Sequence, residues 1–305
     1  MKVLHSRPCP ICGGLSCSQK FPYATKFNGT YFSYLKCLKC TTVYVDPIPD
    51  SQTFAKIYAK ADYHDCYYEG KENKAYTISA QLLKQYLPAK SVVLDYGCGI
   101  GGYLKELKKE NFIPYGVEFD KDAAQAAENN AHCTVLSLDE FMKQSGRVEF
   151  DAIHIGDVLE HLPDPAQVIK LLCGNIKPGG VLFIEGPLQA NPSPVYWASL
   201  LFGVIKRLLI PNFIGIHPPT HLFRTDAKQL KVFFSRFEPC LNLNYWTTYE
   251  TGWPYASGGL IKKTIARIAI VIGGKTLFGL TFGNRYRAIF STRVVRIDSY
   301  NKNLS

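Results

Sequence analysis

An alternation of short apolar runs and helix-like segments between residues 91 and 187 constrains the fold more than any other feature. Each run has the length of a buried strand, and the segments between them carry apolar residues at helical spacing. Strands that alternate with helices build parallel sheets covered on both faces, so we predict an α/β fold. Strands are expected at 91–97, 113–120, 134–138, 150–157 and 178–187, with helices at 102–111, 121–130 and 165–176.

The pattern changes on either side of this region. Residues 226–237 predict a helix, and 241–248 and 286–297 predict two further strands. The domain organisation we expect is a zinc-binding module at 1–50, a helical linker or cap at 51–90, and a cofactor-binding domain at 91–305 with a lid insertion at about 187–219.

A glycine-rich turn follows the first strand of the alternating region. It reads VLDYGCGIGGYL and contains Gly97, Gly99, Gly101 and Gly102. Glycine lets the backbone turn tightly and approach a ligand closely. Three of these glycines also satisfy the dinucleotide-binding pattern GxGxxG, which is a weak signal by itself. The turn therefore predicts a nucleotide-type cofactor without identifying it.

Two acidic residues help to identify that cofactor. Glu118 ends the second strand, where a carboxylate can bind the hydroxyls of an adenosine ribose. Asp95 stands two residues before Gly97, so its carboxylate is expected close to the ligand. It would repel the diphosphate of NAD but suits S-adenosylmethionine (SAM), which carries an ammonium and a sulfonium. SAM is therefore favoured, and an NAD-linked oxidoreductase stays open only if Asp95 points away from the ligand.

Four cysteines near the N-terminus form two CxxC pairs. Cys9 and Cys12 are separated from Cys37 and Cys40 by 24 residues. Each CxxC turn presents two thiolates to one ion, so two turns complete a tetrahedral zinc shell, and such a closed site is structural. Cysteine pairs of this kind indicate a reducing compartment, and the N-terminus has no signal-peptide pattern. A cytoplasmic location is therefore expected.

The motifs of the chain, taken in order, resemble those of class I SAM-dependent methyltransferases. They read LDYGCGIG, GVEFD, FDAIHIGDVLEHLPDP and IKPGGVLFIEGP. The segment DVLEHL is similar to the branch that includes quinone and sugar methyltransferases. The motifs CPICGG and CLKC, followed by DPIP, resemble the zinc module of methyltransferases in sugar and polysaccharide pathways. The resemblance covers roughly residues 1–50 and 90–250.

This resemblance implies a Rossmann-like seven-stranded sheet of order 3-2-1-4-5-7-6 whose last strand is antiparallel. It also implies a set of cofactor contacts. These are Asp95, Gly97, Gly99 and Gly101 in the turn, Glu118 at the ribose, Ser137, Leu138 and Asp139 where the adenine packs, and Asp157 and Val158 beside the methyl group.

Two histidines are candidates for catalysis. Methyl transfer from a sulfonium requires alignment of the acceptor and exclusion of water, and a hydroxyl acceptor also needs a base. His161 and His221 are both expected near the carboxyl ends of strands, where ligands bind in open α/β sheets. For each, the alternative is a structural histidine. His154 lies inside an apolar strand and is expected to be a packed core residue.

Positive charge is concentrated in the last third of the chain. Residues 251–305 hold nine Lys and Arg against one acid, Asp298, which gives +8 of the total +10. A basic surface favours an anionic partner, although it also serves solubility. Together with the aromatic residues of the predicted lid, it suggests a sugar nucleotide or lipid-linked glycan as acceptor, partly by family analogy. The methylated atom, whether oxygen, nitrogen or carbon, stays open.

Residues 195–216 and 257–283 are apolar but interrupted by Lys and Arg, so neither predicts a membrane span. Either segment can be an ordinary packed helix, which we favour, or an amphipathic helix at the inner membrane face. Two other functions stay open. A nucleic-acid methyltransferase is disfavoured because the fourth strand is followed by GDVLEH and lacks an Asn-Pro-Pro-Tyr motif. A non-catalytic SAM-binding protein is disfavoured by the intact glycine turn, which cannot by itself prove turnover.

Overall fold

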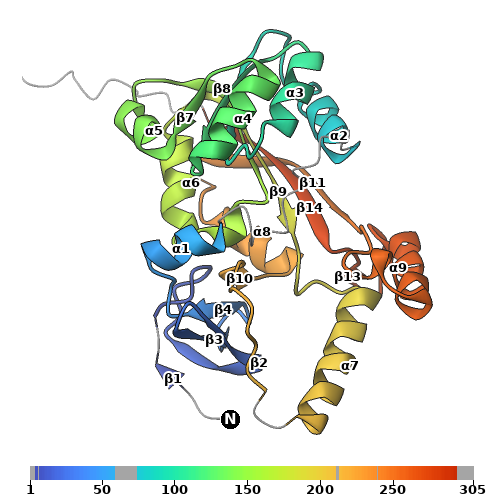
Figure 1. Cartoon of the computed structure of the whole chain (residues 1–305). Coiled ribbons are helices and arrows are strands. Elements are labelled where there is room, and N and C mark those ends of the chain that lie inside the picture. Colours follow the sequence, from blue (N-terminus) through green and yellow to red (C-terminus); the bar gives the residue numbers. More distant parts are fainter. Residues whose placement is uncertain (1–3, 6, 59–73, 211–212, 239, 294–305) are drawn as a thin grey trace, which may run out of the picture.

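The computed structural model describes residues 4–5, 7–58, 74–210, 213–238 and 240–293. Two sheets organise this part of the chain (Figure 1). The larger has seven strands and lies in the upper half of the view, while the smaller has five strands and lies below it. Residues 59–73 of the predicted cap lie outside the described residues.

The larger sheet confirms the predicted α/β fold class. Its order is β11-β14-β9-β8-β5-β6-β7. When the strands are numbered within this sheet alone and read from β7 to β11, the order is the predicted 3-2-1-4-5-7-6. The seventh strand, β14, is antiparallel to both of its neighbours. The strands are β5 (Val92–Tyr96), β6 (Ile113–Glu118), β7 (Val135–Ser137), β8 (Phe150–Gly156), β9 (Ile176–Pro187), β11 (Leu241–Tyr249) and β14 (Arg285–Thr292).

Helices cover both faces of this sheet because its strands are apolar on both sides. Val93 belongs to a buried cluster with one set of helices, and its neighbour Leu94 belongs to the cluster on the opposite face. The first set is α2 (Lys74–Leu83), α3 (Gly102–Lys109) and α4 (Lys121–Ala131), and the second is α5 (Leu138–Gln144), α6 (Pro165–Cys173) and α8 (Ala227–Ser235).

Local sequence signals set where several of these helices begin. Asp120 and Asp164 accept backbone N–H groups in the first turns of α4 and α6. Asp226 and Gln229 form a reciprocal capping box at the start of α8. Such caps satisfy backbone donors that have no partner within the helix, and each contributes about 1 kcal/mol.

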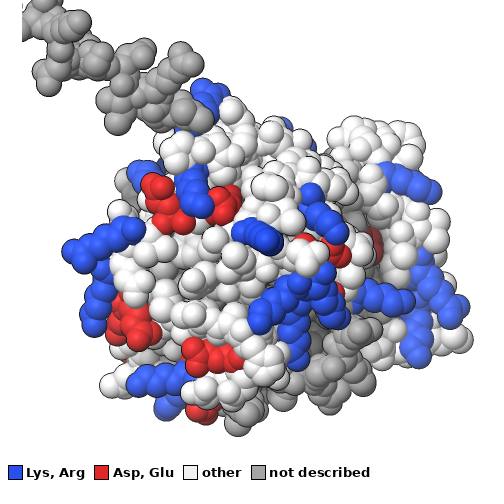
Figure 2. Space-filling view, turned by 90° about the horizontal axis from the view of Figure 1, so that it is seen from above, with Lys and Arg blue, Asp and Glu red and all other residues white. Residues whose placement is uncertain are grey.

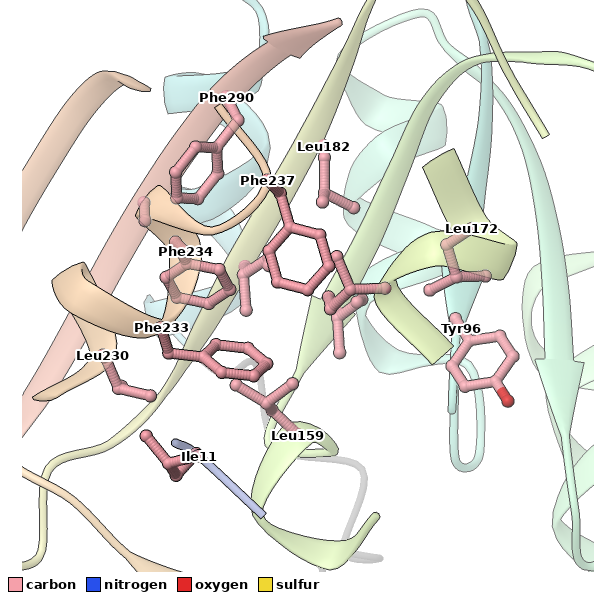
Figure 3. Close-up of a cluster of buried hydrophobic side chains, with 14 of the residues drawn as sticks. Ile11, Tyr96, Leu159, Leu172, Leu182, Leu230, Phe233, Phe234, Phe237 and Phe290 are labelled. Atoms are coloured by element: carbon pink, nitrogen blue, oxygen red, sulfur yellow. The ribbon is translucent and has the colours of Figure 1, made fainter. Parts of the chain in front are cut away.

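Phenylalanines of α8 join the two halves of the molecule. Phe233 and Phe234 of α8, and Phe237 in the turn that follows it, extend towards β9 and β14 (Figure 3). Ile11, from the N-terminal segment, reaches the same buried cluster beside Leu230. The hydrophobic core therefore continues from the seven-stranded sheet into the N-terminal region.

The smaller sheet draws a strand from far along the chain. Its order is β1 (Leu4–His5), β2 (Ser16–Phe27), β3 (Thr30–Cys37), β4 (Val43–Asp46) and β10 (Phe223–Arg224). Asn28 and Gly29 have positive φ and close the β2–β3 hairpin, the geometry that Asn-Gly turns favour. The predicted module at 1–50 thus contributes four of the five strands, and β10 pairs with its last strand.

Helix α1 (Ser51–Ile57) follows the small sheet, and two further helices lie beside the large one. Helix α7 (Pro194–Leu209) projects from the body of the molecule and packs against α9 (Leu260–Ile272) (Figure 1). Val195 is the one residue of α7 that is buried, so α7 is not the ordinary packed helix that we favoured. Among the described residues, no helix combines the length and hydropathy that a membrane crossing needs.

The predicted lid at about 187–219 contains α7, and its described residues 213–219 return towards β10. Gly215 exchanges backbone hydrogen bonds with the second strand of the small sheet, at Ala24 and Lys26. The return therefore runs along the N-terminal sheet. A closing motion of the segment over a ligand stays a prediction.

Candidate active site at the carboxyl edge of the sheet

The glycine-rich turn lies at the carboxyl end of β5. Gly97, Gly99 and Gly101 all have positive φ, at 84°, 52° and 81°. A Cβ on Gly97 would lie 2.4 Å from a methyl group of Val158, so this position has no room for a side chain. The turn is thus packed against Val158 at Gly97, whereas a Cβ on Gly99 would meet no atom within 4 Å, so space for a ligand lies beside Gly99.

Glu118 ends β6 directly beside this turn. Its carboxylate accepts the N–H of Gly99 at 2.8 Å, and also the N–H groups of Phe119 and Asp120. Burial raises the pKa of this carboxyl although those hydrogen bonds oppose the rise. The neighbouring ring of Phe119 is 62% exposed, an unusual state for an aromatic side chain beside a buried acid. The arrangement places the two hydrogen-bond-accepting oxygens of Glu118 next to the exposed aromatic ring of Phe119.

The Asp95 carboxylate is buried and directed towards the next strand. It lies 2.7 Å from Nδ1 of His154. The prediction that Asp95 contacts the cofactor therefore stays a prediction, because its charge is already paired within the protein. The preference for SAM over NAD cannot rest on an isolated negative charge at this position.

A row of charged side chains crosses four neighbouring strands behind the glycine turn. Asp95 on β5 contacts His154 on β8, whose Nε2 lies 3.4 Å from Glu185 on β9. Glu185 in turn pairs with Arg287 on β14 at 2.8 Å. Ser79 of α2 donates a hydrogen bond to Glu185 and accepts one from Arg287. We call Asp95, His154, Glu185 and Arg287 the buried charge row.

The protonation of His154 balances this row. Burial by itself would lower the pKa of His154, but Asp95 and Glu185 outweigh it and raise the pKa to about 9. Burial would raise the pKa of Glu185, yet His154 and Arg287 hold it below its usual value. Two anions therefore face two cations in a site from which water is excluded, and the row carries no net charge.

The other predicted cofactor residues occupy the adjoining strand ends. Ser137 caps α5 and shares a capping box with Glu140, so its hydroxyl is engaged. Leu138 packs at the edge of the core, and Asp139 is exposed in the first turn. These positions lie after β7, as predicted, and their contact with adenine stays a prediction.

Asp157, which follows β8, has a strained backbone and a charged partner. Its φ is 54°, a region that L side chains rarely adopt. Both carboxylate oxygens lie 2.6 Å from one guanidinium nitrogen of Arg285, and the Asp157 side chain is 52% exposed. An ion pair that holds an unfavourable backbone at the end of a central strand is typical of functional sites.

The structure brings the two predicted catalytic histidines together. The rings of His161 and His221 are 4.8 Å apart and nearly perpendicular. His161 Nδ1 donates to the carbonyl of Thr220 at 2.7 Å, and its Nε2 lies 3.8 Å from the carboxylate of Glu160. Burial, together with His161 and two arginines, lowers the pKa of His221 well below its usual value. Together with Glu160, the pair forms one of two potential metal-ligand groups among the described residues.

A polar cavity of about 70 Å³ opens beside these histidines. It lies between the carboxyl end of β9 and the small N-terminal sheet. Within the described part of the chain, three of its buried polar atoms have no hydrogen-bond partner: Gln189 Oε1, His221 Nδ1 and Arg224 Nε. Its lining is Tyr34, Gln189, His217, Pro218, Thr220, His221 and Arg224. Buried polar atoms without partners are rare in native proteins, so the cavity is suited to a polar ligand.

The four predicted metal-binding cysteines also converge. The Sγ atoms of Cys9 and Cys40 are 3.6 Å apart, as are those of Cys12 and Cys37. All four sulfurs lie within 4.8 Å of one another. Zinc–sulfur bonds of about 2.3 Å in a tetrahedron place sulfurs about 3.8 Å apart, so the cluster has the dimensions of a zinc site.

Sequence reasoning missed the partners of these residues. It did not identify Glu185, Arg287, Gln189 or Arg285 as part of the site. For the charge row a signal was present, because each member interrupts an otherwise apolar strand. Charged residues at such positions are almost never buried unless they are paired.

The pH dependence of stability tests the charge row. The pKa of His154 is raised in the folded state, so its contribution is complete below its unfolded value of about 6.5 and is lost as pH rises through about 9. We expect the free energy of unfolding to fall by about 3 kcal/mol over that interval. Denaturant titrations of the wild type and of His154→Gln measure it.

The variant should lack that fall, and His132→Asn, a change at an exposed histidine, should retain it. Equal pH profiles for all three proteins would show that His154 is not protonated in the fold. If His154→Gln does not fold, an NMR titration of the wild-type imidazole reports the same pKa.

Comparison of the chain with known proteins finds methyltransferases of similar sequence. The curated relatives include a ubiquinone biosynthesis O-methyltransferase of Coxiella burnetii, which is 39% identical over 136 residues. The aligned region covers 41% of this chain and 57% of that protein. The corresponding protein of a Shewanella species is 34% identical over 100 residues, which cover 30% of this chain and 42% of that one. The chain thus spans about half the length of the curated relatives it matches.

Solved structures with a similar arrangement share little sequence. A SAM-dependent methyltransferase of Methanosarcina mazei is 16% identical, with a TM-score of 0.46, and covers 70% of this chain and 97% of that one. A magnesium protoporphyrin IX methyltransferase of Synechocystis, solved with bound S-adenosylhomocysteine, is 13% identical with the same TM-score and covers 79% and 93%. Residues 70–238, more than half of the 305, match a family described as a methyltransferase domain. The chain therefore belongs to the methyltransferase domain family.

Proposed function

We propose that this protein transfers a methyl group from SAM to a hydroxyl of a small-molecule acceptor. The observation that carries the proposal is the hydrogen bond from the Gly99 N–H to Glu118, which holds against the glycine turn the carboxylate predicted to bind the ribose. The histidine pair and the polar cavity lie at the carboxyl ends of β8 and β9, in the same sheet. Open α/β sheets bind ligands at this edge.

The residues present fit SAM. Two ribose hydroxyls can donate to the Glu118 carboxylate, and the exposed ring of Phe119 offers a face to the adenine. Gly99 leaves room for the amino-acid end, since a Cβ there would meet no atom within 4 Å. When bound, SAM supplies an electrophilic methyl group on a sulfonium. The charge row behind the turn has no net charge, so it does not repel the positive charge of the sulfonium.

His161 and His221 are suited to removing a proton from the acceptor. His221 can present a lone pair because its low pKa keeps the ring neutral, and His161, which is held by the Thr220 carbonyl, lies beside it. A base with a low pKa removes a proton efficiently only from an acidic hydroxyl. This favours a phenolic acceptor over an aliphatic alcohol.

The acceptor can be one of two chemical classes. The relatives named for ubiquinone biosynthesis support an aromatic ring that carries hydroxyls. The sugar-nucleotide or lipid-linked glycan that we predicted from sequence has no support among these relatives. Arg224, whose guanidinium faces the ring of Tyr34 in the cavity wall, is compatible with the anionic groups of such a glycan. We favour the aromatic acceptor.

We also propose that Cys9, Cys12, Cys37 and Cys40 hold one structural zinc ion. Burial and hydrogen bonds to the neighbouring thiols raise the pKa of Cys12 to about 11, and a bound cation would favour the thiolate form that zinc requires. The cluster is tied to the large domain. Gln229 of α8 donates to the Cys40 carbonyl, and Arg236 donates to the carbonyl of Ile11.

Cofactor binding tests the first proposal. We expect SAM and S-adenosylhomocysteine, but not NAD, to bind in calorimetric titrations of the full chain. Glu118→Ala removes the carboxylate at the ribose, so affinity should fall about 10- to 100-fold, the value of one or two charged hydrogen bonds. Asp122→Ala, an exposed acid four residues away, should bind as the wild type does. Binding of NAD alone would reject the proposal.

Acceptor chemistry tests the histidines. With a substituted catechol as acceptor, His161→Ala or His221→Ala should lower kcat about 10²- to 10⁴-fold and leave SAM affinity unchanged, because only proton removal is lost. His132→Asn serves as the control. Transfer to a nucleotide-linked hexose but not to the catechol would select the glycan class. Unchanged kcat in both variants would assign the histidines a structural role.

Metal analysis tests the zinc proposal. About one zinc per chain is expected, lost in Cys37→Ser, with a fall of more than about 4 kcal/mol in the free energy of unfolding, as for other lost metal sites. Cys240→Ser changes an exposed cysteine and should alter neither quantity. Full stability of Cys37→Ser would contradict a structural zinc ion.

A further inference from the structure

Helix α7 is apolar around most of its exposed circumference. Beyond its root it packs along α9, and in its last turn Lys206 and Arg207 lie over the rings of Phe213 and Tyr23. Its C-terminal half carries a dense series of exposed apolar side chains. Leu208 and Leu209 are both about three-quarters exposed, which is far from the usual state of leucine. The other large exposed apolar residues of the helix are Trp197, Leu200, Leu201, Phe202, Val204 and Ile205.

Helix α9 and the hairpin that follows it extend this apolar surface. Ala266 and Ala269 pack against the root of α7, so the opposite side of α9 faces outward. Leu260 is 82% exposed there, and Ile261 and Val271 are exposed beside it. The hairpin of β12 (Thr276–Leu277) and β13 (Leu280–Thr281) places Phe278 fully in solvent at its tip. An exposed patch of this extent marks an interaction site.

The charges on this surface have one sign. Residues 194–210 and 251–283 contain no Asp or Glu. Their basic side chains are all exposed: Lys206, Arg207, Lys262, Lys263, Arg267 and Lys275. Figure 2 shows Lys and Arg set in uncharged surface on the right-hand lobe, on the side of α9. We call α7, α9 and the β12–β13 hairpin the apolar–basic surface.

The chemistry of this surface selects its partner. A second copy of the chain would bring the same six cations together across a two-fold axis, with no acid on the surface to pair with them. An anionic bilayer accepts both features, because its headgroups attract the cations and its interface accepts the apolar side chains. Helix α7 is roughly 24 Å long, shorter than a hydrocarbon core of about 30 Å, and so can lie in the interface without crossing it.

The apolar–basic surface is firmly attached to the site. Asn191, at the root of α7, donates hydrogen bonds to the carbonyls of Thr281 and Gly283 and accepts one from the N–H of Ala227. Gln189 of the polar cavity precedes this root, and Arg285, the partner of Asp157, follows the hairpin. The surface therefore projects as a fixed platform from the chain segments that line the candidate site.

We propose that the apolar–basic surface docks this protein on an anionic lipid bilayer, with α7 and α9 lying in the interface and Phe278 inserted among the acyl chains. The proposal does not depend on the identity of the methyl acceptor. It concerns a face formed by residues outside the glycine turn, the charge row and the cysteine cluster.

Vesicle sedimentation of the full chain tests the proposal. We expect the protein to pellet with vesicles in which roughly a third of the lipid is phosphatidylglycerol, and weakly or not at all with phosphatidylcholine alone. Salt should weaken binding by screening the cations. Leu208→Asp with Leu209→Asp should abolish pelleting. Lys262→Ala with Lys263→Ala should weaken it about 25-fold, since each basic residue near such a surface contributes about fivefold.

Matched changes elsewhere serve as controls. Val232→Asp alters an exposed apolar residue of α8, and Lys105→Ala with Lys143→Ala removes two exposed lysines, so both proteins should pellet as the wild type does. Failure of the wild type to pellet with either vesicle would overturn the proposal, as would equal binding to neutral vesicles. So would a dimer in sedimentation velocity that Leu208→Asp with Leu209→Asp converts to monomer, because a second copy would then be the partner.

Discussion

The buried charge row is the constraint around which the large domain is arranged. Asp95, His154, Glu185 and Arg287 stand on four adjacent strands, and the cost of burying each charge is offset only by its neighbours. The row fixes the register of β5, β8, β9 and β14 at the point where the glycine turn begins. Removing one member would leave a buried charge without a partner, at a cost of about 3–5 kcal/mol. Ser79 extends the network to α2, so the helix that precedes the first parallel strand is held in the same way.

The acceptor side of the site depends on a different part of the chain. The segment that runs from α7 back to β10 lies against the N-terminal sheet, where Thr25 donates to the carbonyl of His217. Four residues further along, His221 meets His161 from the end of β8. The proposed cofactor site is therefore built by the parallel strands alone, whereas the polar cavity beside the histidines is built where the two sheets meet. A change in the small sheet can thus reshape this cavity and leave the glycine turn as it is.

Sequence reasoning predicts features set by neighbouring residues and misses contacts between residues far apart in the chain. Strand and helix periods between 91 and 187 are properties of neighbouring residues, and the structure has elements in all eight expected places. The glycine turn was recognised because positive φ leaves a residue-type signal. His154 is buried as expected, but its ionic partners are 59 and 31 positions away in the chain, and no local pattern encodes such pairing. The exposure of α7 is not predicted for the same reason, because the sequence pattern of an apolar helix is the same whether the helix is buried or exposed.

The pairing of β10 with β4 has a consequence for how such proteins arise. The region that matches the family begins at residue 70 and includes β10, yet β10 completes a sheet whose other strands all precede residue 50. Recombination at the family boundary would separate two strands of one sheet and leave an open backbone edge on each product. Phe223 and Arg224 pair with Tyr44 and Val43, although these residues are far apart in the sequence. A substitution of the N-terminal segment by another module therefore has to supply a strand edge that fits β10.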